Sequence, residues 1–216
     1  MGRDLRAPRA AGVAGLAFAV LFIASILLLR NHPAPGASAE EVTRWYVQDR
    51  ARHLALVGLY LVPFAGIMFF WFVAVVRHRV GRLEDRFFDT VFLGSSFLFV
   101  AMMFAASAAA GAPVTAVKFL HAPVPSPGTI ELSRGLGYTL LFVYAIRMAA
   151  VFMVVVSTMA LRTGTLPRWL VYAGYAIALI LLGSVSFTAF VVLLFPLWVA
   201  AVSIFVLLSD RVPAAG

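Results

Sequence analysis

Long apolar stretches constrain the fold of this chain more than any other feature. A helix needs roughly 20 mostly apolar residues to cross the hydrocarbon core of a bilayer. Six stretches meet or approach this length, at about residues 11–29, 54–76, 90–112, 136–161, 169–186 and 188–208. Only a turn at residues 184–187 separates the last two, so one bent pair is the alternative to two spans there. The sequence predicts an integral membrane protein with about six spans.

Composition and continuity of the stretches indicate the fold class. With 63% hydrophobic residues and a mean hydropathy of +0.99, the chain has more apolar surface than a soluble domain of 216 residues can bury. A transmembrane β-barrel would instead show alternating segments of about 10 residues. We therefore predict an all-α fold, a polytopic transmembrane helical bundle. Residues 1–216 form a single domain, because no segment outside the spans is long enough to fold separately.

Basic residues predict the orientation in the membrane, because cytoplasmic loops of membrane proteins are enriched in Lys and Arg. Ten fall on the side of the two termini: Arg3, Arg6, Arg9, Arg77, Arg79, Arg82, Arg86, Arg162, Arg168 and Arg211. Six fall on the other side: Arg30, Arg44, Arg50, Arg52, Lys118 and Arg134. We expect both termini in the cytoplasm and a multi-pass location in the cell inner (plasma) membrane. The net charge of +8 then reflects contact with anionic headgroups, and no motif suggests nucleic-acid binding.

The connections carry helix-start signals and breakers. Three arginines precede the first stretch, but its length favours a retained helix over a cleaved signal peptide. Ser38 followed by Glu41 resembles a capping box, which predicts a short helix that could run straight into the second span. Residues 113–135 contain four prolines and are expected to form an ordered surface loop.

Catalytic and metal-binding signatures are weak. The chain has no cysteine, and no serine in the spans has an acid or histidine beside it. His32, His53 and His121 lie on the predicted outer side, but three separate segments would have to converge to bind a metal. We expect no enzyme activity, no metal and no cofactor.

Several short motifs are similar to those of a known group of proteins. They are Val62-Pro63-Phe64-Ala65-Gly66-Ile67, Glu84-Asp85-Arg86-Phe87-Phe88, Arg147-Met148-Ala149-Ala150 and Pro167-Arg168-Trp169. Over about residues 54–208 the chain resembles an uncharacterised family of small six-helix bacterial integral membrane proteins. This resemblance implies the topology and contributes neither an activity nor a site.

Arg147 is the only charged residue deep inside an apolar stretch, and ionisable residues at membrane depth are functional-site candidates. Pro63 and Pro196 fall at similar depth and free the carbonyls of Leu59 and Val192. One hypothesis is that Arg147 locks the bundle through these carbonyls. The other is that Arg147, with Tyr144, binds an anion or a lipid headgroup in a cavity.

These observations favour a non-catalytic accessory or lipid-interacting membrane protein. The alternative is a small transporter or channel for an anionic or small solute that uses Arg147. Its hydrated path to Arg147 would be lined by Tyr144, Ser95, Ser96 or Tyr175. Membrane lipids are the expected partners, and a homo-oligomer or a membrane-protein partner is left open.

Overall fold

The computed structural model describes residues 6–29, 36, 38–80, 86–183 and 189–209, and it contains helices and no strand within this part of the chain. The helices are α1 (Arg6–Leu29), α2 (Ala39–Val47), α3 (Asp49–Val80), α4 (Arg86–Phe119), α5 (Pro127–Tyr138), the π-helix η1 (Thr139–Ala145), α6 (Ile146–Thr163), α7 (Arg168–Gly183) and α8 (Ala189–Ser209). The all-α fold class is confirmed.

Five helical segments are long and apolar enough to cross a membrane. They are Gly12–Leu29, His53–Arg77, Phe87–Phe119, Pro127–Thr163 and Phe190–Ser209. Their most apolar windows have mean hydropathies of 2.0 to 2.8, yet only 39% to 44% of each window is buried inside the protein. Since apolar side chains therefore cover the outside of the bundle as well as its core, the protein is a multi-pass membrane protein.

The sixth predicted span is described only in part. The stretch at residues 169–186 forms α7, whose described residues, Arg168–Gly183, number 16 and measure about 24 Å. The hydrocarbon core of a bilayer is about 30 Å thick, and a sixth full crossing stays a prediction. The predicted turn at residues 184–187 lies outside the described residues.

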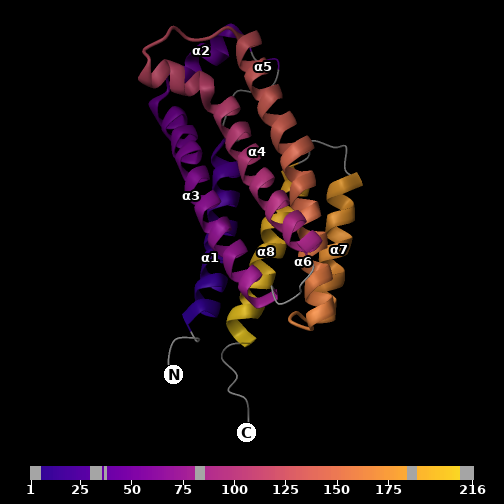
Figure 1. Ribbon diagram of the computed structural model, residues 1–216. Helices are drawn as coiled ribbons and strands as arrows, with labels where there is room; N and C mark the ends of the chain where they lie inside the picture. The colour runs from indigo at the N-terminus through magenta and orange to yellow at the C-terminus, as the bar shows by residue number, and fades with distance from the viewer. Residues whose placement is uncertain (1–5, 30–35, 37, 81–85, 184–188, 210–216) are drawn as a thin grey trace.

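The helices pack as an antiparallel bundle (Figure 1). The main neighbours of α1 are α3 and α8, whereas α4 packs on α3, α5, η1 and α6, and α7 packs mainly on α6. The first turn of α1 and the last turn of α8 lie at the same end of the bundle. At this end the Arg77 guanidinium forms a salt bridge of 3.2 Å with Asp89, which joins α3 to α4.

A cluster of phenylalanines fills the centre of the bundle. Each of the five long segments contributes a fully buried ring to this cluster, and the rings are Phe18, Phe69, Phe99, Phe152 and Phe195. The ring of Phe69 lies 4.9 Å from that of Phe18, 5.1 Å from that of Phe99 and 5.3 Å from that of Phe152, between centroids. These contacts are tilted or edge-on, the geometry that aromatic quadrupoles favour. The core of the bundle is consequently dry and closely packed.

The short helix α2 covers the end of the bundle opposite the termini, and we call it the cap (Figure 1). The Ser38 side chain accepts from the Glu41 backbone N–H and the Glu41 carboxylate accepts from the Ser38 N–H, so the predicted capping box is confirmed. The cap does not continue into the next helix, because Gln48 leaves helical geometry with a ψ of 103°. Beneath the cap, residues from α2 to α5 form a second apolar cluster: Val42, Tyr46, Leu56, Val114 and Ile130.

The predicted surface loop at residues 113–135 is much shorter than expected, because only residues 120–126 of this range lie outside helices. Pro113 lies inside α4, which continues to Phe119, and α5 begins at Pro127. The Ser126 side chain accepts from the Thr129 N–H, and Pro127 occupies the first turn, where its missing N–H costs nothing. From Pro127 the helical chain continues through η1 to Thr163.

Replacing the central ring of the phenylalanine cluster is expected to destabilise the protein strongly. Phe69→Ala leaves a cavity among rings from the neighbouring helices and should lower the free energy of unfolding by about 3–5 kcal/mol. Thermal unfolding of the purified protein in detergent measures the change. Phe64→Ala is the matched control, because Phe64 lies in the same helix but is 57% exposed. Similar losses in both variants would contradict a central role for the cluster.

Alkaline pH is expected to destabilise the cap through Tyr46. Burial raises the pKa of Tyr46 from 10.0 to about 12, although the nearby charge of Arg134 opposes the shift. The unfolded chain therefore loses this proton first, and the stabilisation is complete below pH 10.0 and lost as the pH rises towards 12. Melting temperatures across this range should fall less steeply for Tyr46→Phe than for the wild type. Tyr60→Phe, which removes an exposed hydroxyl, should retain the steep fall.

Candidate functional site

Arg147 is partly buried and bonds to the backbone of its own helical segment. Its Nη1 atom donates to the carbonyl oxygen of Phe142 at 2.8 Å and to that of Val143 at 3.0 Å. Helical side chains lean towards the N-terminus of their helix, which directs the guanidinium back to these carbonyls. The charge is thereby held against acceptor groups of the same segment.

The π-helix explains why a carbonyl is available to Arg147. At the end of η1 the Ile146 N–H donates to the Leu141 carbonyl, five residues back. In an α-helix the Ile146 N–H would instead donate to the Phe142 carbonyl. The Phe142 carbonyl therefore lacks the backbone donor that an α-helix would give it. A backbone carbonyl without a partner is costly in hydrocarbon. The arginine supplies the replacement donor.

The predicted partners of Arg147 are not the ones that accept these bonds. Sequence reasoning assigned the carbonyls of Leu59 and Val192, which Pro63 and Pro196 free, whereas Nη1 donates within its own segment. The π-helix, which carries no proline signal, supplies acceptors within the segment that carries Arg147. The Tyr144 side chain is 52% exposed, and neither Tyr144 nor Arg147 lines the cavity of the bundle.

The residues proposed to line a transport path bond within the bundle. Ser95 donates to the Phe92 carbonyl at 3.1 Å, and Ser96 donates to the Leu93 carbonyl at 2.8 Å. The Tyr175 hydroxyl lies 2.7 Å from the Thr158 hydroxyl, which joins α7 to α6. These hydroxyls therefore form hydrogen bonds within a helix or between two helices of the bundle.

The histidines do not assemble a metal site within the described residues, where no group of three or more His, Asp or Glu could hold an ion. His121 lies in the connection between α4 and α5, with a φ of 52°. His53 lies in α3, and His32 is outside the described residues.

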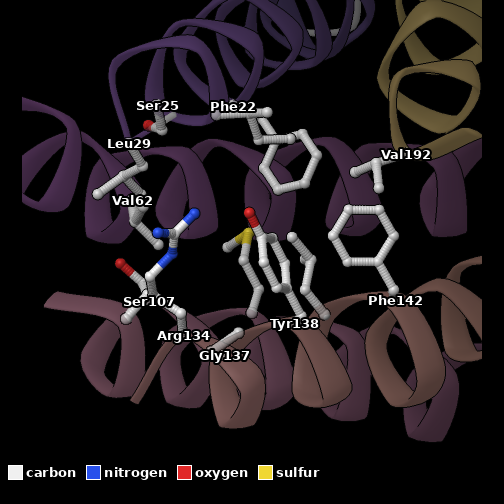
Figure 2. Close-up of a pocket in the computed structure, with 15 residues that line it drawn as sticks. Phe22, Ser25, Leu29, Val62, Ser107, Arg134, Gly137, Tyr138, Phe142 and Val192 are labelled. Atoms are coloured by element: carbon white, nitrogen blue, oxygen red, sulfur yellow. The ribbon is translucent and has the colours of Figure 1, made fainter. Parts of the chain in front are cut away.

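A cavity of about 210 Å³ lies between α1 and the α5–η1 segment (Figure 2). Four helical segments supply its walls, and α8 contributes one residue at the far end. The lining residues are Phe22, Ser25, Ile26, Leu29, Val62, Met103, Ala106, Ser107, Ala110, Arg134, Gly137, Tyr138, Leu141, Phe142 and Val192. Most are apolar, and none of them is acidic. Tyr138 is 43% exposed, so the cavity reaches the surface of the bundle.

The polar groups of the cavity gather at one end. Arg134 and Tyr138 are one helical turn apart on α5, and Figure 2 shows the guanidinium and the hydroxyl pointing the same way, towards α1. Ser25 on α1 lies on the opposite wall and donates to the Leu21 carbonyl at 2.7 Å. Phe142 and Val192 lie at the other end of the view. The cavity thus has a cationic end and an apolar end.

Ser107 adds an unsatisfied hydroxyl to the lining. Its side chain is only 8% exposed, and its Oγ atom has no hydrogen-bond partner among the described residues. Buried hydroxyls in proteins are nearly always bonded, and an exception in a cavity wall indicates a place for water or a ligand.

Close packing of α5 on α4 positions the cationic end. A Cβ atom at Gly137 would lie 3.0 Å from both the Ala106 carbonyl oxygen and the Ala110 Cβ, which is tighter than most Cβ contacts, so glycine favours this approach. The Ser133 hydroxyl also donates to the Ala109 carbonyl. The small residues of α4 therefore allow the close approach of α5 that brings Arg134 and Tyr138 to the cavity.

Sequence reasoning missed these residues because it placed Arg134 in a loop and did not distinguish Tyr138 within its span. The signal that could have found them is Ser126-Pro127, an N-cap followed by proline in the first turn. A helix starting there places residues 134 and 138 on one face.

No protein-family model, curated protein or solved structure matches the chain. The resemblance to a family of six-helix bacterial proteins therefore remains a prediction.

Removing the Arg147 side chain is expected to lower stability. Arg147→Leu leaves the Phe142 carbonyl without its donor, which should cost about 1–3 kcal/mol and lower the melting temperature in detergent. Arg147→Lys keeps the charge and a donor, so its melting temperature should lie between those of the wild type and Arg147→Leu. Arg44→Leu, which removes an exposed arginine of α2, serves as the control. An unchanged or raised melting point for Arg147→Leu would rule out the structural role.

Proposed function

We propose that this protein is a non-catalytic integral membrane protein that binds membrane lipid in the cavity between α1 and the α5–η1 segment. The observation that carries the proposal is the cavity itself, an apolar space that reaches the surface of a bundle whose centre is otherwise filled by phenylalanines. Apolar clefts with a few convergent polar groups are the usual form of ligand sites.

The position of the cavity in the membrane supports a lipid as the ligand. The helical segment Pro127–Thr163 has 37 residues and is about 55 Å long, which exceeds the hydrocarbon thickness of about 30 Å. Arg134 precedes Arg162 by 28 residues along this segment, about 42 Å. A bilayer with its headgroups is about 40–45 Å thick, so the two arginines match opposite headgroup layers. The apolar end of the cavity then lies at the depth of lipid chains.

Transport through the bundle has less support. A solute path along the axis of the bundle would have to pass the phenylalanine cluster, whose five rings are buried. Arg147 donates to backbone carbonyls, which favours the structural role for it. Both termini in the cytoplasm, a plasma-membrane location, six spans and an accessory role towards another membrane protein or a second copy remain parts of the proposal.

Photo-crosslinking with an alkyl chain that carries a diazirine near its end tests the proposal. All spanning helices contact lipid outside, so labelling of exposed residues carries no information. Met103, Ala106 and Ser107 are buried and line the cavity. We expect a reconstituted protein to be labelled at these residues, with sites mapped by mass spectrometry.

A cavity-filling variant provides the control. Ala110 lines the cavity, and Ala110→Phe should occupy it and remove labelling of the buried residues while labelling of exposed Phe97 continues. Labelling confined to exposed residues in the wild type would refute lipid binding in the cavity.

A further inference from the structure

We infer that the cavity selects an anionic amphiphile with a single alkyl chain, whose carboxylate or phosphate lies at Arg134 and Tyr138 and whose chain extends towards Phe142 and Val192. This inference rests on the proposed function, since it names the chemical class of lipid that the cavity takes.

The charge of the lining selects the headgroup. Arg134 is permanently charged, with five donors and no acceptor, and its planar guanidinium matches the two oxygens of a carboxylate or phosphate. The Tyr138 hydroxyl is a further donor one turn along the same helix face. None of the fifteen lining residues is acidic, so the charge of the lining is the positive charge of Arg134. A cationic headgroup would meet repulsion there.

The shape of the cavity selects the number of chains. A volume of about 210 Å³ holds roughly seven groups of the size of a water molecule, at about 30 Å³ each. Pockets for larger ligands span roughly 300–1,000 Å³, so two acyl chains do not fit inside. From Arg134 to Phe142 the helix rises about 12 Å, which suits a headgroup followed by the first part of one chain.

The unsatisfied hydroxyl of Ser107 is an independent sign of a ligand. It is buried in the wall formed by α4, and it lacks a partner among the described residues. An oxygen atom of a bound headgroup, or a water molecule held beside it, satisfies this hydroxyl. An apolar chain alone would leave it unpaired.

Binding of matched twelve-carbon probes to the purified full chain, in a detergent with a neutral headgroup, tests the inference. The probes are dodecanoate, dodecyl phosphate, dodecanol and inorganic phosphate, and affinity is measured by calorimetry and by the rise in melting temperature. We expect the two anionic amphiphiles to bind at least about tenfold more tightly than dodecanol, a difference of about 1.4 kcal/mol. Inorganic phosphate, which lacks a chain, should bind more weakly than dodecyl phosphate by a similar factor.

Variants assign the preference to its residues. Arg134→Gln should reduce the affinity for dodecanoate about tenfold and leave that for dodecanol unchanged, whereas Arg134→Lys should give a smaller loss because the charge remains. Tyr138→Phe should reduce dodecanoate binding about threefold, the loss of one donor. Lys118→Gln makes the same charge change on α4 outside the cavity and should have no effect. The melting temperature without probe verifies that each variant is folded.

The outcomes separate the inference from the function on which it rests. If dodecanol and dodecanoate bind with equal affinity and Ala110→Phe prevents the binding of both, selection of an anion is overturned and lipid binding in the cavity stands. Equal affinity for inorganic phosphate and dodecyl phosphate would reduce the cavity to an ion site and overturn the role of the chain. If Ala110→Phe leaves binding of every probe unchanged, the cavity is not the lipid site and both proposals fail.

Discussion

The phenylalanine cluster is the interaction on which the rest of the fold depends. In lipid, helices gain little from hydrophobic burial against one another, so their association depends on close packing and on polar contacts. Phe69 contacts rings from four other helices, Phe18, Phe99, Phe152 and Phe195, and therefore fixes the positions of α1, α4, α6 and α8 around α3. The cavity begins beside this aromatic centre, at Phe22, whose ring centroid lies 5.4 Å from that of Phe18.

Arg134 and Arg147, which both lie in the helical segment Pro127–Thr163, are held in different surroundings. Arg147 lies among apolar residues, where its charge is tolerated because the shift between the π-helix and the α-helix exposes the Phe142 carbonyl as an acceptor. Arg134 lies 13 residues earlier and lines a cavity with Tyr138 and Ser107. The two charges therefore differ in what they meet, which is backbone carbonyls for Arg147 and a cavity for Arg134.

Much of the fold was predictable because the length of an apolar stretch and the residues that begin or end a helix are local properties of the sequence. The helices, the capping box at Ser38 and Glu41, and the dense packing of small residues on α4 follow from them. The error at residues 113–135 arose from counting prolines as breakers. Pro113 lies inside α4. Pro127 begins α5, because a proline in the first turn has no N–H to satisfy.

The sequence by itself determined that this chain is an all-helical membrane protein with one charge at depth, since both conclusions depend only on the hydropathy and order of its residues. Tertiary structure decided which groups that charge meets and where a ligand can enter. The partners of Arg147 depend on a π-helix that no local sequence pattern predicts. The cavity depends on how closely α1, α4 and α5 approach one another. Such distances between helices arise from packing of residues far apart in the chain, so Arg134, Tyr138 and Ser107 form a site only once the bundle is assembled.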